Sequence, residues 1–334
     1  MEKWAFAFVV FGLIAVLTVA WLVVLRRWRR GGRRAALWGL GASCVALYAV
    51  VLLEIVFGHF VVKSDGYGIT RAGYRWFQTY WRPINSLGYR DVEPVAPAEG
   101  QKVLLVVGDS LMAGHGIARL EDRFASLLAR GLGSDWSVPV AAMCGWNTGD
   151  EIEALEQWPH RFDRLLVTYT LTDIETAALD LGRTRPDPAI EPPPALVRSI
   201  VAHSFFFNWV YWRYVRQDFG TRYPDFLEAM YQDPAVWAAH EARLGALVDL
   251  ARSRGADVRF VLWPDMPRLD ECAGPFAQVA QFLGARQVPV LDLTAQFRGR
   301  DPAALTVNEL DEHPNEGVQA EIAAVVADWL QQGG

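Results

Sequence analysis

Two long apolar runs, residues 4–25 and 35–53, stand out at the start of the chain, and neither contains a charged side chain. Each run is long enough to cross a hydrocarbon core of roughly 30 Å at about 1.5 Å per residue. The residues between them, 26–34, include six arginines. The pattern therefore predicts a two-helix transmembrane hairpin over residues 1–62, with an arginine-rich connecting loop.

The arginine-rich loop also predicts the orientation of this hairpin. A signal peptide carries its basic residues ahead of the apolar run, whereas here the basic cluster follows it. Arginines in a short loop mark the cytoplasmic side, so we expect a multi-pass protein of the cytoplasmic (inner) membrane, with residues 63–334 periplasmic or extracellular. The alternative is a hairpin buried in a soluble core, although uncharged runs of this length seldom occur there. Glu54, near the outer end of the second run, is interpreted as an interfacial carboxylate or as a contact with another membrane protein.

Beyond a linking segment, residues 63–101, short apolar runs alternate with helical stretches. Strands are expected at 103–107, 138–143, 165–169, 258–263 and 288–293. Helices are expected near 121–132, 149–158, 234–254, 275–286 and 315–330. Nearly continuous apolar runs suit strands that are buried on both faces. Residues 102–334 are therefore predicted to form an α/β domain with three layers around a parallel five-stranded sheet.

The connection between the third and fourth expected strands is too long for a simple crossover. We place an insertion at about 174–232, in which a proline-rich stretch, 185–194, precedes a densely aromatic segment, 204–212. Long insertions often form a lid or a wall facing the substrate. A helix packed on the sheet is an equally good interpretation, because aromatic stripes more often belong to a core.

The charge is distributed unevenly along the chain. Residues 1–62 hold seven basic and two acidic residues, a net +5, whereas the remainder holds 25 basic and 36 acidic residues, a net −11. An acidic domain argues against nucleic-acid binding. Cys144 and Cys272 could pair in an oxidising compartment, although nothing in their spacing requires it. The cysteines and histidines show no spacing typical of a metal site, so we expect neither a metal nor a cofactor.

Two short segments carry candidate chemistry. The first expected strand runs into Gly108-Asp109-Ser110-Leu111, which places Ser110 at a strand-to-helix turn. Ligands of such sheets bind at the carboxyl ends of the strands, and amides at a helix start stabilise an oxyanion. A serine nucleophile needs a base, and a segment near the other end of the chain holds Asp311 two residues before His313. Each segment alone is a weak signal.

Taken together and in order, these segments resemble the SGNH, or GDSL-type, hydrolases over residues 102–330. That family comprises esterases and acyltransferases with a flavodoxin-like sheet and a Ser-His-Asp triad. The resemblance implies Ser110 as the nucleophile, with His313 and Asp311 as base and orienter. It also implies that the amides of Ser110 and Gly145 form the oxyanion hole, since Gly145 matches the glycine of the second block.

The sequence departs from the family pattern at two positions. Thr172 stands where the third block has asparagine, and a hydroxyl offers one shorter donor than a carboxamide. Thr172 is therefore a substitute oxyanion donor, or the site is slow, or the insertion completes the hole. Asp311 precedes His313 by two residues where many members have three, which leaves Glu309 and Glu312 as fallback orienters. Either departure would also suit a domain that has lost catalysis.

A narrower resemblance lies in residues 85–91 and in the Gly-Trp-Asn-Thr turn at 145–148. Both are similar to membrane-anchored SGNH proteins that act with membrane-bound O-acyltransferases, although a turn packed against the domain explains residues 85–91 equally well. The implied function is a membrane-anchored serine esterase or O-acyltransferase that handles acyl, above all acetyl, esters of an extracytoplasmic glycan through an acyl-enzyme. The expected partners are the bilayer, the glycan or another acyl ester, and a membrane-bound O-acyltransferase. The alternatives are a lipid-directed esterase or thioesterase, and a non-catalytic subunit of an acyltransfer complex.

Overall fold

The computed structural model describes residues 12, 14–16, 18–26, 34–66, 68–186, 193–215 and 222–332. These residues form two compact units. The helical unit consists of the described parts of Met1–Lys63, Ile69–Arg75 and Ile190–Arg216. The sheet unit consists of the described parts of Ser64–Gly68, Trp76–Ala189 and Gln217–Gly334.

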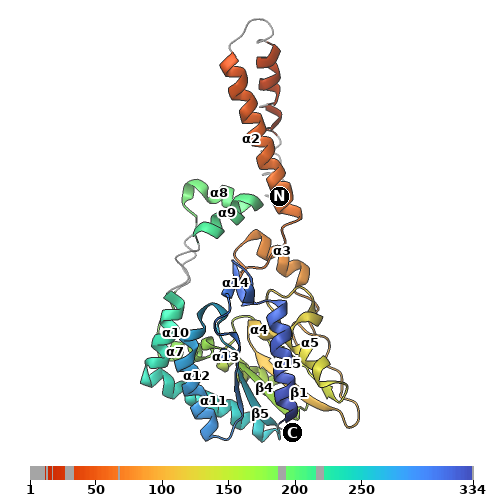
Figure 1. Ribbon diagram of the computed structural model, residues 1–334, viewed down its shortest axis with the longest axis vertical. Coiled ribbons are helices and arrows are strands. Elements are labelled where there is room, and N and C mark those ends of the chain that lie inside the picture. Colours follow the sequence, from red (N-terminus) through yellow and green to blue (C-terminus); the bar gives the residue numbers. More distant parts are fainter. Residues whose placement is uncertain are drawn as a thin grey trace. The chain divides into compact units, whose positions relative to one another are not determined.

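The sheet unit is built on parallel strands (Figure 1). They are β1 Lys102–Gly108, β2 Trp136–Ser137, β3 Val140–Ala142, β4 Arg164–Tyr169, β5 Asp257–Leu262 and β6 Val290–Asp292. The spatial order is β2-β1-β4-β5-β6, and β3 also pairs with β1. The chain therefore leaves β1 toward one edge and returns to its other side at β4. This reversal makes the carboxyl end of β1 a switch point, where ligands of α/β sheets bind.

The sheet differs from the prediction in two respects. The expected strand at 138–143 corresponds to β3 alone, and the short strand β2, just before it, was not predicted. β2 pairs with the first residues of β1 and β3 with the last, so the two occupy one strand position. The described residues of the sheet form six strands, so the prediction of five strands is wrong. A separate antiparallel pair, β7 Thr306–Asn308 and β8 Asp311–Pro314, was not predicted. Its strands are too short to show a period of two.

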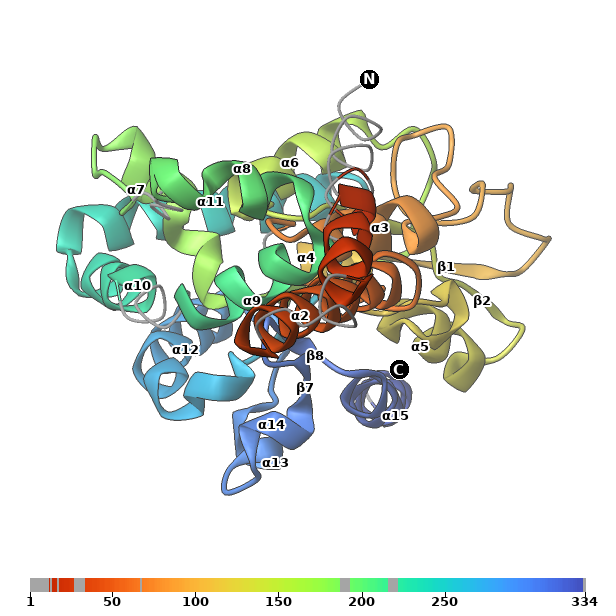
Figure 2. The same cartoon turned by 90° about the horizontal axis from the view of Figure 1, so that it is seen from above.

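Helices cover both faces of the sheet (Figure 2). They are α4 Ser110–Ala113, α5 Phe124–Leu132, α6 Thr148–Gln157, α7 Glu175–Asp180, α10 Arg222–Gln232, α11 Pro234–Ser253, α12 Leu269–Ala285, α13 Thr294–Phe297, α14 Pro302–Leu305 and α15 Glu316–Gln332, with the 3-10 turns η1 Leu120–Asp122, η2 Leu171–Ile174 and η4 Met266–Arg268. β1 is buried on both sides: Leu105 and Val107 pack with α6, α11 and α12, whereas Leu104 and Val106 pack with α5 and α15. The α/β fold with three layers is thus as predicted.

The helical unit contains α2 Arg34–His59, α8 Ala195–His203 and α9 Phe205–Val215. Within α2, Trp38–His59 is long and apolar enough to cross a membrane. The first apolar run forms a shorter helix, Ile14–Arg26, and the hydroxyls of Thr18 and Tyr48 lie 2.7 Å apart. The rest of that run lies outside the described residues, so the hairpin stays a prediction. The aromatic segment 204–212 lies largely in α9, which packs on α2 in this unit and not, as one interpretation had it, on the sheet.

Residues 85–91 of the linking segment pack into the sheet unit. Asp91 pairs with the buried guanidinium of Arg123 at 2.8 Å and accepts the amide of Val140 at 2.9 Å. The buried Arg90 donates to the carbonyl of Tyr80 and to four carbonyls around the turn that follows α4. These four belong to Ala113, Gly114, Ile117 and Ala118. The segment therefore fixes the turn next to Ser110.

Cys144 and Cys272 are free thiols. Cys144 lies in the loop after β3, and Cys272 is buried in α12 with its sulfur 3.4 Å from the amide of Asp265. The pairing of Cys144 with Cys272, which the sequence left open, is absent from the structure.

Candidate active site

Ser110 is the first residue of α4 and stands at the carboxyl end of β1. The turn before it requires a glycine, because a Cβ on Gly108 would collide with the hydroxyl of Thr168. Asp109 caps α4 by accepting a hydrogen bond from the amide of Leu111 at 2.9 Å. The serine is thereby held in a tight turn at the switch point of the sheet.

His313, on β8, joins Ser110 to a buried carboxylate. Its Nε2 lies 2.8 Å from the hydroxyl oxygen of Ser110, and its Nδ1 lies 2.6 Å from Oδ1 of Asp311. A carboxylate can only accept, so Nδ1 carries the proton and Nε2 is left to accept the proton of the serine hydroxyl. The structure therefore brings together Ser110, His313 and Asp311 in one hydrogen-bonded chain, although 203 positions separate the serine from the histidine.

The pKa values of His313 and Asp311 are shifted in opposite directions. Burial alone would lower the pKa of His313, but the charge and hydrogen bond of Asp311 outweigh it and raise that pKa above its ordinary value. Burial alone would raise the pKa of Asp311, yet the charge and hydrogen bond of His313 hold it well below its usual range. The carboxylate is therefore ionised at neutral pH and stabilises a protonated imidazole.

Asp311 has two further donors. The hydroxyl of Ser64 donates to Oδ2, and the backbone amide of His313 donates to Oδ1 at 3.1 Å. Glu312 points elsewhere, to Arg268 at 2.9 Å. Asp311 is thus the residue that orients His313, despite the shorter spacing.

A second histidine, His115, packs against His313, and the sequence analysis missed it. The two rings are stacked with their centroids 4.2 Å apart and an angle of 18° between the planes. Nε2 of His115 lies 2.9 Å from the carbonyl oxygen of Asp65, and Nδ1 lies 3.7 Å from the sulfur of Cys144. Burial, then the charge of His313, lowers the pKa of His115 to about 3, so this ring is neutral. Since the carbonyl must accept, Nε2 carries the proton, and Nδ1 accepts from the thiol.

One local feature of the sequence points to His115: it lies between two glycines, Gly114 and Gly116. Both glycines have a positive φ, 79° and 83°, which bends the chain sharply on either side of the histidine. A turn of this kind directly after a nucleophile can aim a side chain back into the site. Neither of the two short motifs, around Ser110 and around His313, includes these residues.

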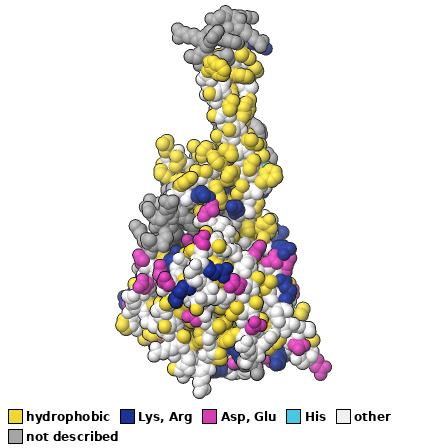
Figure 3. All heavy atoms as spheres, viewed as in Figure 1, with side chains coloured by type: hydrophobic (Ala, Val, Ile, Leu, Met, Phe, Trp, Pro, Cys, Tyr) yellow, Lys and Arg dark blue, Asp and Glu magenta, His cyan; other side chains and the backbone are white. Residues whose placement is uncertain are grey.

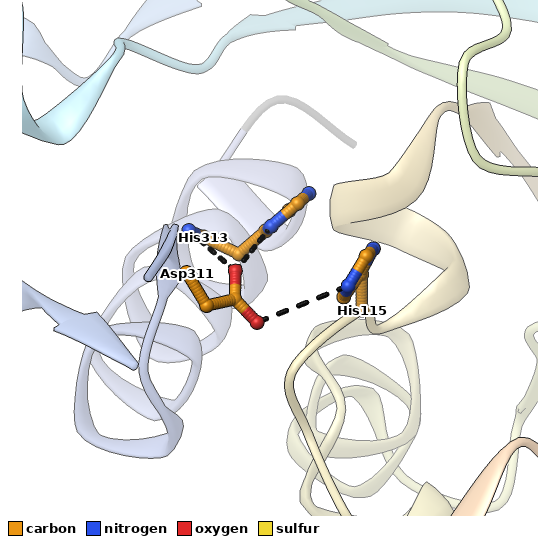
Figure 4. A group of neighbouring side chains, drawn as sticks. All are labelled: His115, Asp311 and His313. Carbon is orange, nitrogen blue, oxygen red and sulfur yellow. Dashed lines mark hydrogen bonds and ion pairs between the residues drawn. The ribbon is translucent and has the colours of Figure 1, made fainter. Parts of the chain in front are cut away.

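His115, Asp311 and His313 lie close enough to share a metal ion, since one ligand atom from each falls within 4.8 Å of the others. Figure 4 shows the Asp311 carboxylate beside the two stacked rings, with one oxygen toward His313 and the other toward His115. The ring nitrogens that face it are Nδ1 of His313 and Nε2 of His115, and both carry protons in the hydrogen bonds described above. A metal ligand must offer a lone pair, so this arrangement fits a hydrogen-bonded triad better than a metal centre.

The two other predicted site residues lie in loops at the same edge of the sheet. Gly145, between β3 and α6, has a φ of 80°, and a Cβ there would meet open space. Thr172 is in η2, directly after β4, with its hydroxyl oxygen 2.9 Å from that of Thr170. The hydroxyl of Thr170 in turn donates to Asp109 at 3.3 Å. Thr172 therefore belongs to a chain of hydroxyls that begins beside the nucleophile.

Two acidic residues, Glu151 and Asp173, are buried next to this chain, and Asp109 is half-buried. Asp173 accepts the amide of Thr170 at 2.7 Å and the hydroxyl of Thr148 at 3.2 Å, whereas Oε2 of Glu151 has no hydrogen-bond partner among the described residues. Burial raises the pKa of Asp173 to about 8. Burial, followed by the charges of Asp173 and Asp109, raises the pKa of Glu151 well above its ordinary value. These carboxyl groups favour the neutral form at the pH where Asp311 is charged.

The chain matches one known family and is similar to several solved structures. The model of a family described as GDSL-like Lipase/Acylhydrolase matches residues 106–320. Among solved structures, the chain is similar to a psychrotrophic esterase, EstA, from Pseudoalteromonas sp. (15% identity, 69% of this chain and 100% of that chain, TM-score 0.41). It is also similar to Est24, a carbohydrate acetylesterase from Sinorhizobium meliloti (12% identity, 70% of this chain and 100% of that chain, TM-score 0.40). A comparison with curated proteins finds no match.

Proposed function

The chain belongs to the GDSL-like lipase/acylhydrolase family of ester hydrolases, and we propose that Ser110, His313 and Asp311 are its catalytic triad. The observation that carries the proposal is the unbroken chain of hydrogen bonds from the Ser110 hydroxyl through His313 to Asp311, at 2.8 and 2.6 Å. His313 removes the proton of Ser110 as the oxygen attacks the ester carbonyl, and Asp311 stabilises the imidazolium that forms.

The reaction then proceeds through an acyl-enzyme. The amides of Ser110 and Gly145 hold the oxyanion, with Thr172 as a third donor. His313 passes its proton to the leaving alcohol, which departs and leaves the acyl group on the serine. Water or a sugar hydroxyl next gives up a proton to His313 and attacks the acyl group. The bond between the acyl carbon and the Ser110 oxygen then breaks, and His313 returns its proton to that oxygen. Hydrolysis and transfer thus differ only in the acceptor.

We further propose that the enzyme is anchored in the cytoplasmic membrane and acts outside the cytoplasm on acyl, chiefly acetyl, esters of a glycan. The apolar helix Trp38–His59 supports the anchor. The six arginines in residues 26–34 support an outward-facing catalytic unit. The glycan and a membrane-bound O-acyltransferase partner rest on the resemblance of residues 85–91 and 145–148 to anchored relatives.

Turnover of p-nitrophenyl esters of acetate and of a long-chain acid tests this proposal. The full chain in detergent should hydrolyse the acetyl ester, and a sugar acceptor should capture part of the acetyl group. Ser110→Ala should reduce turnover by roughly 10⁴–10⁶-fold, while Ser134→Ala, at an exposed serine, should not. A preference for the long-chain ester would favour the lipid-directed alternative. No turnover, together with no covalent labelling of Ser110 by a fluorophosphonate, would favour the non-catalytic alternative.

The orientation has its own test. A reporter that is active only in the cytoplasm, fused at the C-terminus, should stay silent in cells that make the full chain. A second fusion of the same reporter, placed in the arginine-rich loop at residue 31, should be active. The reverse pattern would overturn the extracytoplasmic location and the glycan substrate together.

A further inference from the structure

We propose that α8 and α9 form a helical pair that lies in the membrane–water interface, with its exposed apolar face on the lipid. This inference rests on the proposal that α2 spans the membrane. It assigns the aromatic part of the insertion to membrane binding instead of to a lid. The bilayer it fits carries anionic headgroups.

Glu54 fixes the depth of this pair on α2. One oxygen of its carboxylate accepts the amide of Phe205 at 2.6 Å, and the other accepts the hydroxyl of Ser204 at 2.7 Å and the amide of Phe206 at 3.1 Å. The carboxylate therefore caps the start of α9. Glu54 precedes His59, the end of the apolar span, by five residues, which is about 7–8 Å along a helix. The start of α9 thus lies beside the last turns of the span, at the depth of the interface.

Aromatic packing holds α9 against the same part of α2. The ring of Phe57 lies 5.2 Å from that of Phe206 and 6.3 Å from that of Trp209, measured between centroids. Gly58 lies against the ring of Phe205, since a Cβ added there would meet that ring at an ordinary contact distance of 3.5 Å. Phe57 and Gly58, near the end of the span, therefore form the surface of α2 on which α9 packs.

α8 is fixed to α9, so that the two helices form one surface. The side chain of Asn208 donates to the carbonyl of Val201 at 3.0 Å and accepts the amide of Arg71 at 2.9 Å. The guanidinium of Arg71 donates to the carbonyl of Ala202 and lies over the ring of Phe205. Because Asn208 and Arg71 join the two helices, the depth of α9 in the membrane also determines the depth of α8.

The outer face of the pair is apolar. Leu196 is 92% exposed and Ile200, one turn later, 46%; on α9, Tyr214 is 67% exposed and Phe207, two turns earlier, 37%. Figure 3 shows hydrophobic side chains covering much of the surface of the helical unit, while charged side chains are scattered over the sheet unit. An apolar helix face that continues from a membrane span, with tyrosine at its border, is typical of interfacial helices.

The charge of the helical unit suits anionic lipid. Outside the span, its described residues include the basic residues Lys63, Arg71, Arg75, Arg198 and Arg213. Glu54 is the only acidic residue in the described part of this unit, and its carboxylate is used in capping α9. Basic side chains around an apolar face attract anionic headgroups.

Nitroxide scanning of the full chain in phosphatidylcholine–phosphatidylglycerol vesicles tests the proposal. Single cysteines replace Leu52 on α2, Leu196 on α8, or Arg198, which lies on the opposite side of α8 from Leu196, in a background with Cys144→Ser. Collision rates with oxygen report lipid exposure and those with a water-soluble nickel chelate report water exposure. Labels at 52 and 196 should be reached several-fold better by oxygen than by nickel, and the label at 198 better by nickel.

The outcomes separate this inference from the proposal beneath it. Water exposure at both 52 and 196 would overturn the membrane anchor itself. Lipid exposure at 52 with water exposure at 196, or with shielding of 196 from both reagents, would overturn the interfacial pair alone, the latter in favour of a protein contact. Glu54→Leu should make the label at 196 more accessible to nickel without changing the label at 52, with Glu54→Gln intermediate. An unchanged label at 196 would show that Glu54 does not set the depth.

Discussion

Asp311 and Asp173 are both buried in the sheet unit, on either side of the turn that holds Ser110, yet their charge states differ. Asp311 is 0% exposed, and its pKa is held well below the usual range by His313 and by the hydroxyl of Ser64. Asp173 is 3% exposed, and burial raises its pKa to about 8. No basic residue pairs with it among the described residues. Because the two side chains are buried to nearly the same degree, the difference between their pKa values comes from the groups around them.

This comparison assigns different tasks to the two sides of Ser110. On the β8 side, a charged carboxylate faces an imidazole whose pKa it raises, which is what a general base requires. On the β4 side, the carboxyl group of Asp173, which favours the neutral form, accepts hydrogen bonds from the hydroxyls of Thr170 and Thr148 and caps the turn η2 through the amide of Thr170. With the proposed triad, this contrast assigns proton transfer to the first side and loop positioning to the second.

The largest expected effect is that of Asp311→Asn. An amide would present the wrong donor pattern to Nδ1 of His313, so the ring would turn its proton toward Ser110, and kcat should fall roughly 10⁴-fold with little change in KM. Asp173→Asn is the matched control, because Asp173 is already largely neutral at pH 7. Equal losses in acetyl-ester turnover for the two asparagine variants would contradict the division between the two sides.

Thr172→Asn should raise acetyl-ester turnover by about tenfold or more. A carboxamide reaches further than a hydroxyl, and one good oxyanion donor is worth roughly 10²–10³ in rate. The hydroxyl of Thr172 is only 2.9 Å from that of Thr170, so in the proposed oxyanion hole Thr170 would compete with the oxyanion for its proton. Thr172→Val serves as the control. Three equal rates would show that Thr172 takes no part in the chemistry and that the third block is misaligned.

A smaller loss in kcat, about tenfold, is expected for His115→Ala, because His313 would lose the ring stacked against it at 4.2 Å. His115→Phe keeps a flat ring and should lose less, with KM unchanged in both. The pH profile shows whether His115 acts only by position. Since the pKa of His313 is raised, activity should be lost as the pH falls through a value above 6.5. The midpoint should be the same in His115→Phe, because His115 is already neutral there; a shifted midpoint would mean that it titrates.

The sequence predicted those parts of the molecule that leave a local pattern. Apolar runs located the strands, and short motifs placed Ser110 and His313 at the same edge of the sheet. His115 and Ser64 could not be found in this way, because their contacts with the pair are set by tertiary packing; Ser64 lies 247 positions from Asp311. The packing of α9 on α2 was missed for the same reason, although a carboxylate such as Glu54 is unusual near the end of an apolar span.

The smallest expected effect, that of Glu151→Gln, concerns stability. In the folded chain Glu151 favours the neutral form, whereas in the unfolded chain it ionises above about pH 4.3. The unfolded state therefore binds fewer protons, and the free energy of unfolding falls as the pH rises from that value toward the raised pKa of the folded state. Glutamine cannot ionise, so the variant should gain about 1 kcal/mol, or ~2–4 °C in Tm, at pH 8. At pH 4.5 the gain should vanish.

Turnover of the acetyl ester should not change in Glu151→Gln, because the residue belongs to the β4 side, which positions loops. Glu156→Gln, at an exposed glutamate on the same helix, removes the same charge without the burial and should leave Tm unchanged at both pH values. A Tm gain for Glu151→Gln that is equal at pH 4.5 and pH 8 would mean that glutamine packs better and that ionisation plays no part. In that case the neutral carboxyl group on this side of Ser110, and with it the contrast to Asp311, would have to be given up.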